Sequence, residues 1–228
     1  MSTVTLDIAS NLDVAAKAVG DLAAKQIPYA TALALTRTAA SLARDELPNQ
    51  MRTRLSQGGP PTAFTLRAFQ YQRAEKNSLV AVVYSAKAQD RYLRVLTTGG
   101  TRGLKRFERR YGSLAADLKA ALVPTGKLKK NASGNVSLAT IRRIGETVAK
   151  DRSGRYFIGK PRGGNRPVGV YERVSRGRVK RLIPLFVEVS PPRYGRLLPL
   201  KAIAEQHVAQ VFQGELNKAL AIAMASAR

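Results

Sequence analysis

Positive charge is concentrated in one central segment of this chain, and this limits how the chain can fold. Of the formal net charge of +24, residues 91–181 account for +19, with 24 Lys and Arg against five Asp and Glu. Residues 1–90 contribute +3 and residues 182–228 contribute +2. Because packing like charges together is unfavourable, the central segment must stay solvated or meet something anionic. We therefore expect an ordinary folded scaffold at the two ends and a functional surface in the middle.

The first part of the chain predicts a long helix followed by a β-hairpin. Pro28 suits the first turn of a helix, and an apolar stripe at helical spacing runs from Ala30 to Leu47. Pro48 should kink or restart this helix, because it lacks an amide hydrogen and crowds the preceding turn. Two β-rich runs then flank a polar turn and predict an antiparallel hairpin. They are residues 64–71 and residues 79–85.

The central segment predicts two helices and a loop. Residues 104–122 favour a helix that is interrupted near Gly112. Residues 124–137 are rich in Lys, Asn, Gly and Ser, which is typical of a long surface loop. Residues 138–150 predict a short helix.

Three strands and a long helix are expected to complete the scaffold. The strands are expected at residues 155–159, 168–174 and 182–189. Pro184 argues that the last strand lies at an edge or begins after the proline. Apolar residues from Leu200 to Ala223 predict a C-terminal amphipathic helix. We therefore expect an α+β fold, with long N- and C-terminal helices packed on an antiparallel sheet. Residues 1–228 would form a single domain, with residues 91–181 as a basic, loop-rich insertion within it.

Composition argues against catalysis and against a bound cofactor. The chain has no cysteine, so it can form neither a disulfide framework nor a thiolate metal site. Its one histidine, His207, has no partner that spacing can identify, so a structural or surface role is favoured. The 15 carboxylates show no ligand-like cluster. We expect neither enzyme activity nor a cofactor; a site built from groups such as Asp151 and Tyr156 is the remaining enzymatic alternative.

The sequence predicts a soluble protein with an anionic partner. Residues 1–7 lack the basic head and apolar core of a signal peptide, and no apolar run approaches the ~20 residues needed to span a bilayer. An isoelectric point near 11.1 points to nucleic acid, an acidic protein surface or an anionic membrane. Aromatic residues make up only 6% of the chain, which counts against a protein that stacks on unpaired bases.

The most distinctive stretch of the chain is residues 99–111. Its first two residues are glycines, which permit a backbone turn that is closed to other residue types. Leu104, Phe107 and Tyr111 then repeat at helical spacing, which leaves the charged residues mostly outward. The stretch is either an amphipathic helix with a solvated basic face or a loop–helix arm that docks on an acidic partner or a nucleic-acid backbone. The docking candidates are Gly99, Gly100, Arg102, Lys105, Arg106, Glu108, Arg109 and Arg110.

Further basic residues lie in segments that connect predicted elements. Residues 159–166 lack the spacing of a Walker phosphate loop, and Pro161 removes an amide donor, so they indicate a basic loop between strands. Its arginines can still contact phosphates nonspecifically. Gly and charge dominate residues 124–137 and 160–181, which is typical of segments that fold on docking. The candidates for contacts with DNA or an acidic partner are Lys127, Lys129, Lys130, Lys160, Arg162, Arg166, Arg176 and Arg178.

Several short segments occur in an order that is more specific than any one of them. They are Pro60–Leu66, Gly99–Tyr111, Tyr156–Pro161, Gly169–Arg173 and Ile183–Phe186. In this order they resemble the tail-completion proteins of long-tailed bacteriophages, the group of lambda minor tail protein Z and its neck-protein relatives, over about residues 27–212. The family pattern has Pro-Thr-x-Phe-Thr-Leu, Gly-Gly-x-Arg-x-x-Lys-x-x-Glu, Phe-x-Gly-x-Pro and Gly-(Ile/Val)-(Trp/Tyr)-Glu-Arg segments. This chain departs from the family after Gly126, where it is rich in Lys and the family's acidic turn is not evident.

The resemblance implies a structural virion protein that is not an enzyme. Such proteins are made in the bacterial host cytoplasm and assemble as homo-oligomeric rings, commonly of six subunits, at the head–tail junction. They complete the tail and join it to the head connector, around a channel that carries DNA. The expected partners are the tail terminator, head-completion or connector proteins, with weak nonspecific contacts to DNA and no membrane.

The amount of charge limits how much of it can face DNA. A compact chain of this length is roughly 45 Å across, and duplex DNA of that length carries about 26 phosphate charges. Six copies of the basic segment would bring about 114 net positive charges. We therefore expect a minority of the cations to line the channel and the rest to meet acidic neighbours. The alternative is a free basic nucleic-acid-binding protein, although no helix-turn-helix, zinc-finger or RNP-like signature is present.

Overall fold

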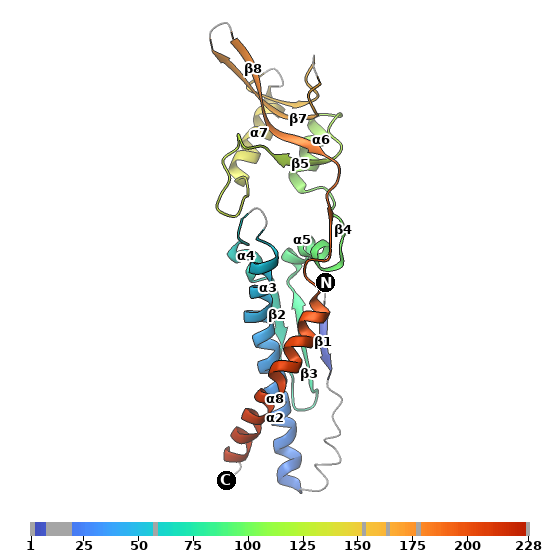
Figure 1. Cartoon of the computed structure of the whole chain (residues 1–228), viewed down its shortest axis with the longest axis vertical. Coiled ribbons are helices and arrows are strands. Elements are labelled where there is room, and N and C mark those ends of the chain that lie inside the picture. The colour runs from blue at the N-terminus through green and yellow to red at the C-terminus, as the bar shows by residue number, and fades with distance from the viewer. Residues whose placement is uncertain are drawn as a thin grey trace. The chain divides into compact units, whose positions relative to one another are not determined.

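The fold belongs to the α+β class, as the sequence predicts (Figure 1). The computed structural model describes residues 3–7, 20–56, 59–151, 154–162, 165–176 and 179–226. The chain divides into two compact units, whereas the sequence analysis expected a single domain. The first unit comprises residues 1–57, 61–99 and 195–228, and the second comprises residues 58–60 and 100–194. The second unit thus contains most of the predicted basic insertion.

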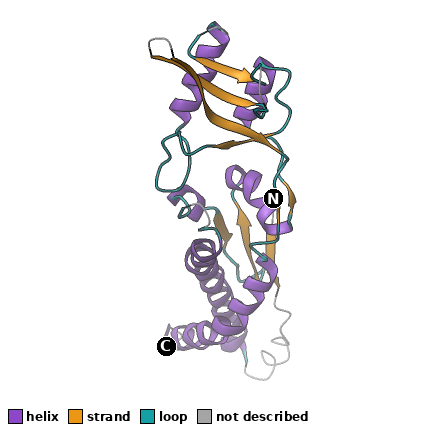
Figure 2. Ribbon diagram, turned by 45° about the horizontal axis from the view of Figure 1, so that its top comes forward, coloured by secondary structure: helices purple, strands orange, loops and turns teal. Residues whose placement is uncertain are grey.

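The first unit packs long helices on a three-stranded antiparallel sheet. Its elements are β1 (Thr3–Asp7), α2 (Asp21–Ser41), the π-helical turn η1 (Leu42–Glu46), α3 (Leu47–Arg54), α4 (Ala63–Leu66), β2 (Phe69–Gln72), β3 (Val80–Ser85), α5 (Lys87–Thr98) and α8 (Leu200–Ser226). The strand order is β1-β3-β2, and Tyr84 of β3 lies opposite both Thr3 and Gln70. The N-terminal helix α2 and the C-terminal helix α8 run side by side and both contact the sheet (Figure 2). This confirms the predicted packing.

Small and branched apolar side chains hold the first unit together. Ala30 and Ala34 of α2 are buried with Ala219 and Ala223 of α8, and small side chains allow two helix backbones to approach closely. Next to this contact lies a larger apolar core between the helices and the sheet. Its most buried members include Leu35, Leu42, Met51, Leu93 and Leu198.

Pro48 restarts the long helix, as predicted. The five residues of η1 form a π-helical turn directly before α3, and Pro48 then lies in the first turn of α3. In a π-helical turn the backbone hydrogen bonds span five residues instead of four. Because Pro48 follows this turn at the start of α3, its missing amide hydrogen interrupts no hydrogen bond inside α3.

The predicted hairpin forms, but its first half is shorter than expected. β2 and β3 pair antiparallel, whereas residues 63–66 form the single helical turn α4. The Thr62 hydroxyl caps this turn by accepting a hydrogen bond from the Thr65 backbone N–H at 3.2 Å. A local cap therefore outweighs the β propensity of Phe64 and its neighbours.

The second unit has a sheet and an apolar core of its own. Its elements are β4 (Gly100–Thr101), α6 (Arg106–Leu114), β5 (Ala121–Pro124), α7 (Leu138–Lys150), β6 (Tyr156–Gly159), β7 (Gly169–Arg176), β8 (Val179–Val189) and β9 (Arg193–Tyr194). The strand order of the main sheet is β5-β8-β7-β6, and β4 pairs with β9. Tyr111, Ile144, Val170 and Phe186 are at most 1% exposed in the core. Because these apolar residues sit among the cations at helical and strand spacing, the basic segment folds as a unit instead of a loop-rich insertion.

Most elements of the second unit follow the predictions. The three predicted strands appear as β6, β7 and β8, and α7 has the predicted bounds. The helix expected over residues 104–122 is α6 alone, because the chain leaves α6 after Leu114 and returns as strand β5.

Pro184 lies in an inner strand, although the prediction placed it at an edge or ahead of the strand. β8 runs between β5 and β7, but β5 pairs only with residues 186–189 of β8. Pro184 therefore lies where β8 has a strand partner on one side, and a β-bulge shifts the register next to it, so that Tyr171 lies opposite Pro184. A free strand side and a bulge are the places that tolerate a missing amide donor.

Candidate functional site

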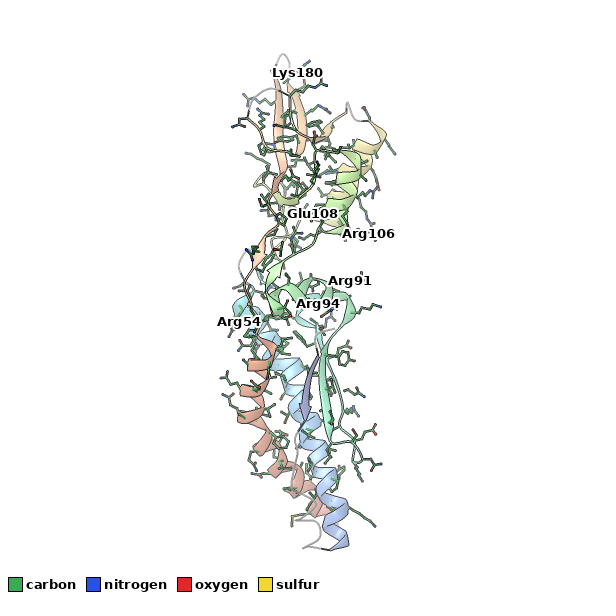
Figure 3. The ribbon with its side chains drawn as sticks, turned by 90° about the vertical axis from the view of Figure 1, so that its right-hand side faces the viewer. Arg54, Arg91, Arg94, Arg106, Glu108 and Lys180 are labelled. Atoms are coloured by element: carbon green, nitrogen blue, oxygen red, sulfur yellow. The ribbon has the colours of Figure 1, made fainter. Side chains whose placement is uncertain are left out.

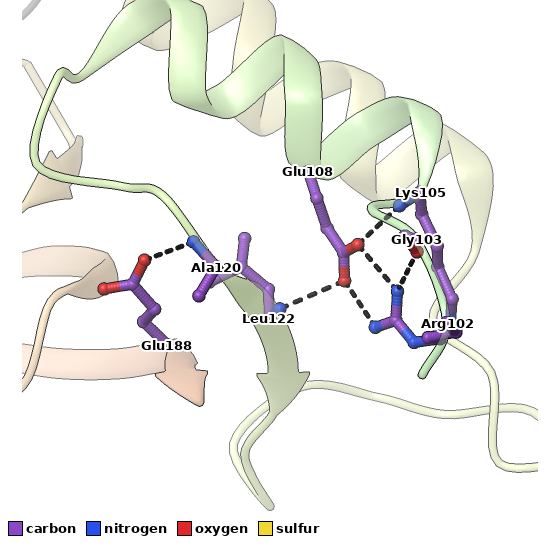
Figure 4. Close-up of polar contacts among 7 residues, drawn as sticks. All are labelled: Arg102, Gly103, Lys105, Glu108, Ala120, Leu122 and Glu188. Atoms are coloured by element: carbon purple, nitrogen blue, oxygen red, sulfur yellow. Dashed lines mark hydrogen bonds and ion pairs between the residues drawn. The ribbon is translucent and has the colours of Figure 1, made fainter. Parts of the chain in front are cut away.

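Arg102 and Glu108 form a buried ion pair inside the second unit (Figure 4). Arg102 donates from Nη1 and Nη2 to the two carboxylate oxygens of Glu108 at 2.8 and 2.7 Å. The backbone N–H groups of Lys105 and Leu122 donate to the same carboxylate at 2.5 and 3.0 Å. The Glu108 side chain is 0% exposed and that of Arg102 is 16% exposed. The pair joins the start of α6 to β5, so its role is to hold the fold.

The environment keeps the Glu108 carboxylate ionised. Burial alone would raise its pKa, but the hydrogen bonds from Arg102, Leu122 and Lys105 outweigh burial and lower the pKa. The hydrogen bond to Glu108 likewise raises the pKa of Arg102. The outward position predicted for Glu108 is therefore wrong, and the ion pair occupies both Glu108 and Arg102, which were docking candidates. The helical spacing of residues 104–111 placed Glu108 on the charged face, but its position in the first turn of α6 lets it reach back to Arg102 and Lys105.

The other docking candidates between residues 99 and 110 have the backbone conformation or the exposure that the sequence analysis expected. Gly99 and Gly100 have positive φ values of 77° and 115°, a backbone conformation that only glycine adopts easily, as the sequence analysis expected. The remaining cations of this stretch are exposed on or next to α6: Lys105, Arg106, Arg109 and Arg110. Figure 3 labels Arg106 on this helix. These cations stay candidates for a partner surface.

Two further segments of the resemblance, residues 156–161 and 169–173, also help to hold the second unit together. Gly159 of β6 lies opposite Gly169 of β7. The Tyr171 hydroxyl donates to the Pro167 carbonyl at 2.5 Å, and the Arg173 guanidinium donates to the carbonyls of Gly154 and Tyr156. The segments that carry the resemblance thus include hydrogen bonds and strand pairs that specify this fold.

Five cations gather around a pocket of about 650 Å³ in the second unit. The pocket lies along residues 180–184 of β8, on the part of that strand that β5 does not pair with. Loop residues before β7 and after β5 complete it. The nine lining residues are Lys127, Pro161, Arg162, Arg166, Lys180, Arg181, Leu182, Ile183 and Pro184. All five cations are exposed, and no carboxylate is among the described residues that line the pocket.

The pocket brings together three predicted residues and two that the sequence reasoning missed. Lys127, Arg162 and Arg166 were candidates, whereas Lys180 and Arg181 were not. The missed pair lies in strand β8, and only the fold shows that this strand runs beside the loop of Arg166, whose Nη1 approaches the Leu182 carbonyl at 3.4 Å. Figure 3 labels Lys180 near the end of the paired strands β7 and β8.

The other basic candidates do not line this pocket. Lys129, Lys130 and Lys160 are exposed elsewhere on the second unit. Arg178 and the side chain of Arg176 lie outside the described residues.

The carboxylates of the second unit do not neutralise its cations. The unit has 23 Lys and Arg against six Asp and Glu, a formal net charge of +17. Glu108 pairs with Arg102, and Glu172 pairs with Arg155 at 2.5 Å. Glu188 accepts hydrogen bonds from the backbone N–H groups of residues 119 and 120, both at 2.6 Å (Figure 4). Half of the acidic residues thus stabilise the fold, and the basic surface remains open to an outside anion.

His207 connects two helices of the first unit. Its Nε2 lies 2.8 Å from the Ser41 Oγ, and Ser41 donates its hydroxyl hydrogen to the Thr38 carbonyl at 3.0 Å. The direction of the hydrogen bond between Ser41 and His207 is set by which imidazole nitrogen carries the hydrogen, and the contact ties α8 to α2 in either case. Within the described ranges, no group of three or more acidic or histidine side chains is arranged to hold a metal ion.

The state of His207 gives a testable pH dependence. Burial lowers the pKa of His207 and outweighs the nearby carboxylates of Glu46 and Asp45, which act to raise it. As the pH falls, the unfolded chain therefore binds a proton at His207 at a higher pH than the folded chain does. The contribution of His207 to the free energy of unfolding is fully present above about pH 6.5 and decreases as the pH drops below that value. We expect the urea midpoint of the wild type to decrease between pH 7.5 and 5.5, and the decrease to be smaller in His207→Gln, which keeps an N–H donor. Equal decreases in both proteins would contradict this assignment.

The comparisons with known proteins add no relative. Neither protein-family models nor curated proteins nor solved structures gave a match to this chain. None of the helices in the described part of the chain combines the length and apolar character needed to cross a bilayer.

Proposed function

We propose that this chain is a structural protein of the head–tail junction of a long-tailed bacteriophage. In this proposal it forms a homo-oligomeric ring, contacts neighbouring neck and tail proteins, and surrounds a channel through which DNA passes. The observation that carries the proposal is the net charge of +17 on one compact unit, in which half of the few carboxylates are engaged in the fold. The charge alone indicates some anionic partner. The ordered segments that resemble tail-completion proteins favour the head–tail junction, with its DNA and neighbouring neck proteins, as that partner.

The kind of cations in the second unit suits a passing polyanion. They are mostly exposed Lys and Arg side chains, which contact phosphates without reading bases. Exposed charge pairs are weak, so DNA can slide past them. A ring of such units would provide more positive charge than a duplex can use, which leaves cations for acidic neighbours.

Removal of the gene from the phage tests this function. We expect tail-deficient particles and a loss of infectivity, both restored when the wild-type chain is supplied in trans. Electron microscopy would then locate the protein at the junction of complemented particles. Normal infectious virions without the protein would refute the proposal.

The cationic pocket favours a second candidate, a free nucleic-acid-binding protein. This candidate predicts that the isolated chain binds DNA tightly near 150 mM salt, with log affinity falling by about 0.9 per contacted phosphate as log salt rises. It also predicts normal tails when the gene is removed. The phenotype of the deletion therefore separates the two functions.

A further inference from the structure

We propose that the cationic pocket along β8 binds the phosphate backbone of duplex nucleic acid. The site consists of Lys127, Arg162, Arg166, Lys180 and Arg181. This inference deepens the proposed function and depends on it only for the identity of the duplex, the phage genome.

The pocket presents hydrogen-bond donors and few free acceptors. Along the open side of β8, the carbonyl of Leu182 faces Arg166, and the carbonyls of Pro184 and Leu185 accept from the hydroxyl and backbone N–H of Thr125 at 2.7 and 2.9 Å. These contacts engage three of the backbone carbonyls at this edge. Because no carboxylate is among the described lining residues, the pocket suits a ligand made of acceptors, and phosphate oxygens are such acceptors.

The lining favours a nucleic-acid backbone over a protein surface. Five of the nine lining residues are cations and none is aromatic. The centre of a protein–protein interface is normally depleted of charge and rich in aromatic residues. The absence of aromatic rings among the described lining residues also disfavours single strands, which bind by stacking their bases. A duplex, whose bases are already stacked, needs only the cations.

The ends of β7 and β8 extend this cationic surface. Residues 174–176 of β7 pair with residues 179–181 of β8, and among the described strands no third one pairs with them there. A second depression of about 320 Å³ lies along this two-stranded ribbon and shares Lys180, Arg181 and Leu182 with the first. Two-stranded ribbons fit the major groove of DNA, so a duplex can meet the ribbon and the pocket together.

A salt titration with matched variants tests the assignment. The pocket variant is Arg162→Gln, Lys180→Gln and Arg181→Gln. The control variant is Arg142→Gln, Arg143→Gln and Lys150→Gln, which removes three exposed charges from α7 of the same unit. Binding of a 30-base-pair duplex of mixed sequence is measured by fluorescence anisotropy from 50 to 300 mM salt.

We expect the pocket variant to lose about three phosphate contacts. The slope of log affinity against log salt should fall by about 2.7, and the affinity at 0.1 M salt should fall roughly 10²–10³-fold. The control variant should change the affinity by no more than about threefold, because separated surface charges are screened within about 10 Å at this salt concentration. Equal losses in both variants would show diffuse attraction and overturn the pocket assignment.

Three competitors distinguish the possible ligands. Single-stranded DNA and poly-glutamate should displace the duplex less well than unlabelled duplex of equal charge does. Pyrophosphate at micromolar concentration should not displace it at all. Preferential displacement by poly-glutamate would assign the pocket to an acidic protein, and displacement by pyrophosphate would assign it to a small phosphorylated ligand; either result overturns the proposal. A normal phage without the gene would refute the neck function but leave a pocket-dependent duplex affinity standing.

Discussion

Replacing Glu108 with alanine should destabilise the second unit by about 3–5 kcal/mol, the usual effect of removing one partner of a buried ion pair. The substitution leaves the Arg102 guanidinium in a site where it is only 16% exposed and has lost its carboxylate. It also removes the acceptor of the Leu122 backbone N–H, which lies at the start of β5. Urea unfolding measures the free energy, and amide hydrogen exchange of Leu122 and α6 shows where protection is lost.

Matched substitutions distinguish the loss of the Glu108–Arg102 ion pair from the effect of removing any carboxylate of this unit. Glu146→Ala removes an exposed carboxylate from α7 of the same unit, so its unfolding free energy should stay within about 0.5 kcal/mol of the wild type. Arg102→Lys keeps the positive charge but cannot reproduce the two parallel hydrogen bonds, so an intermediate loss is expected. If Glu108→Ala and Glu146→Ala were equally stable, the ion pair would not hold this unit.

The lowered pKa of Glu108 adds a pH dependence with a definite sign. A carboxyl group whose pKa is lower in the folded state stabilises the fold above its ordinary pKa, which is about 4.3, and this contribution is lost as the pH falls below that value. Glu108→Gln should therefore show a smaller loss of stability than the wild type between pH 5 and pH 3.

Local sequence patterns predicted most elements but not the way they meet. The bounds of α7 follow from its own apolar spacing, and the long C-terminal helix follows from the stripe between Leu200 and Ala223. Glu108 was assigned to the outer face because helical spacing reports on α6 alone. Its partners Arg102 and Leu122 lie on other segments, which the spacing cannot place.

The cationic pocket shows the same limit for the functional surface. Charge counting singled out Lys127, Arg162 and Arg166, which belong to loops rich in glycine and cations and line the pocket. Lys180 and Arg181 belong to a strand, and strand register decides which loop they face. A count of charges also gave no sign of the second apolar core. Apolar residues such as Tyr111 and Phe186 are few in this basic segment, but they form the core of the second unit.

Gly169→Ala should cost about 3 kcal/mol or more, because no side chain fits at this position. A Cβ atom on Gly169 would lie 2.3 Å from the carbonyl oxygen of Phe186 and 3.2 Å from the Cα of Val187, both backbone atoms of the neighbouring strand β8. β7 and β8 would have to separate in the middle of the sheet, where Phe186 is 1% exposed in the core. The matched control is Gly126→Ala, whose Cβ would meet no atom within 4 Å and which should stay within about 1 kcal/mol of the wild type. Urea unfolding gives the two free energies, and limited proteolysis of β6 to β8 reports a variant that does not fold. A Gly169→Ala protein as stable as Gly126→Ala would mean that β7 and β8 do not approach this closely.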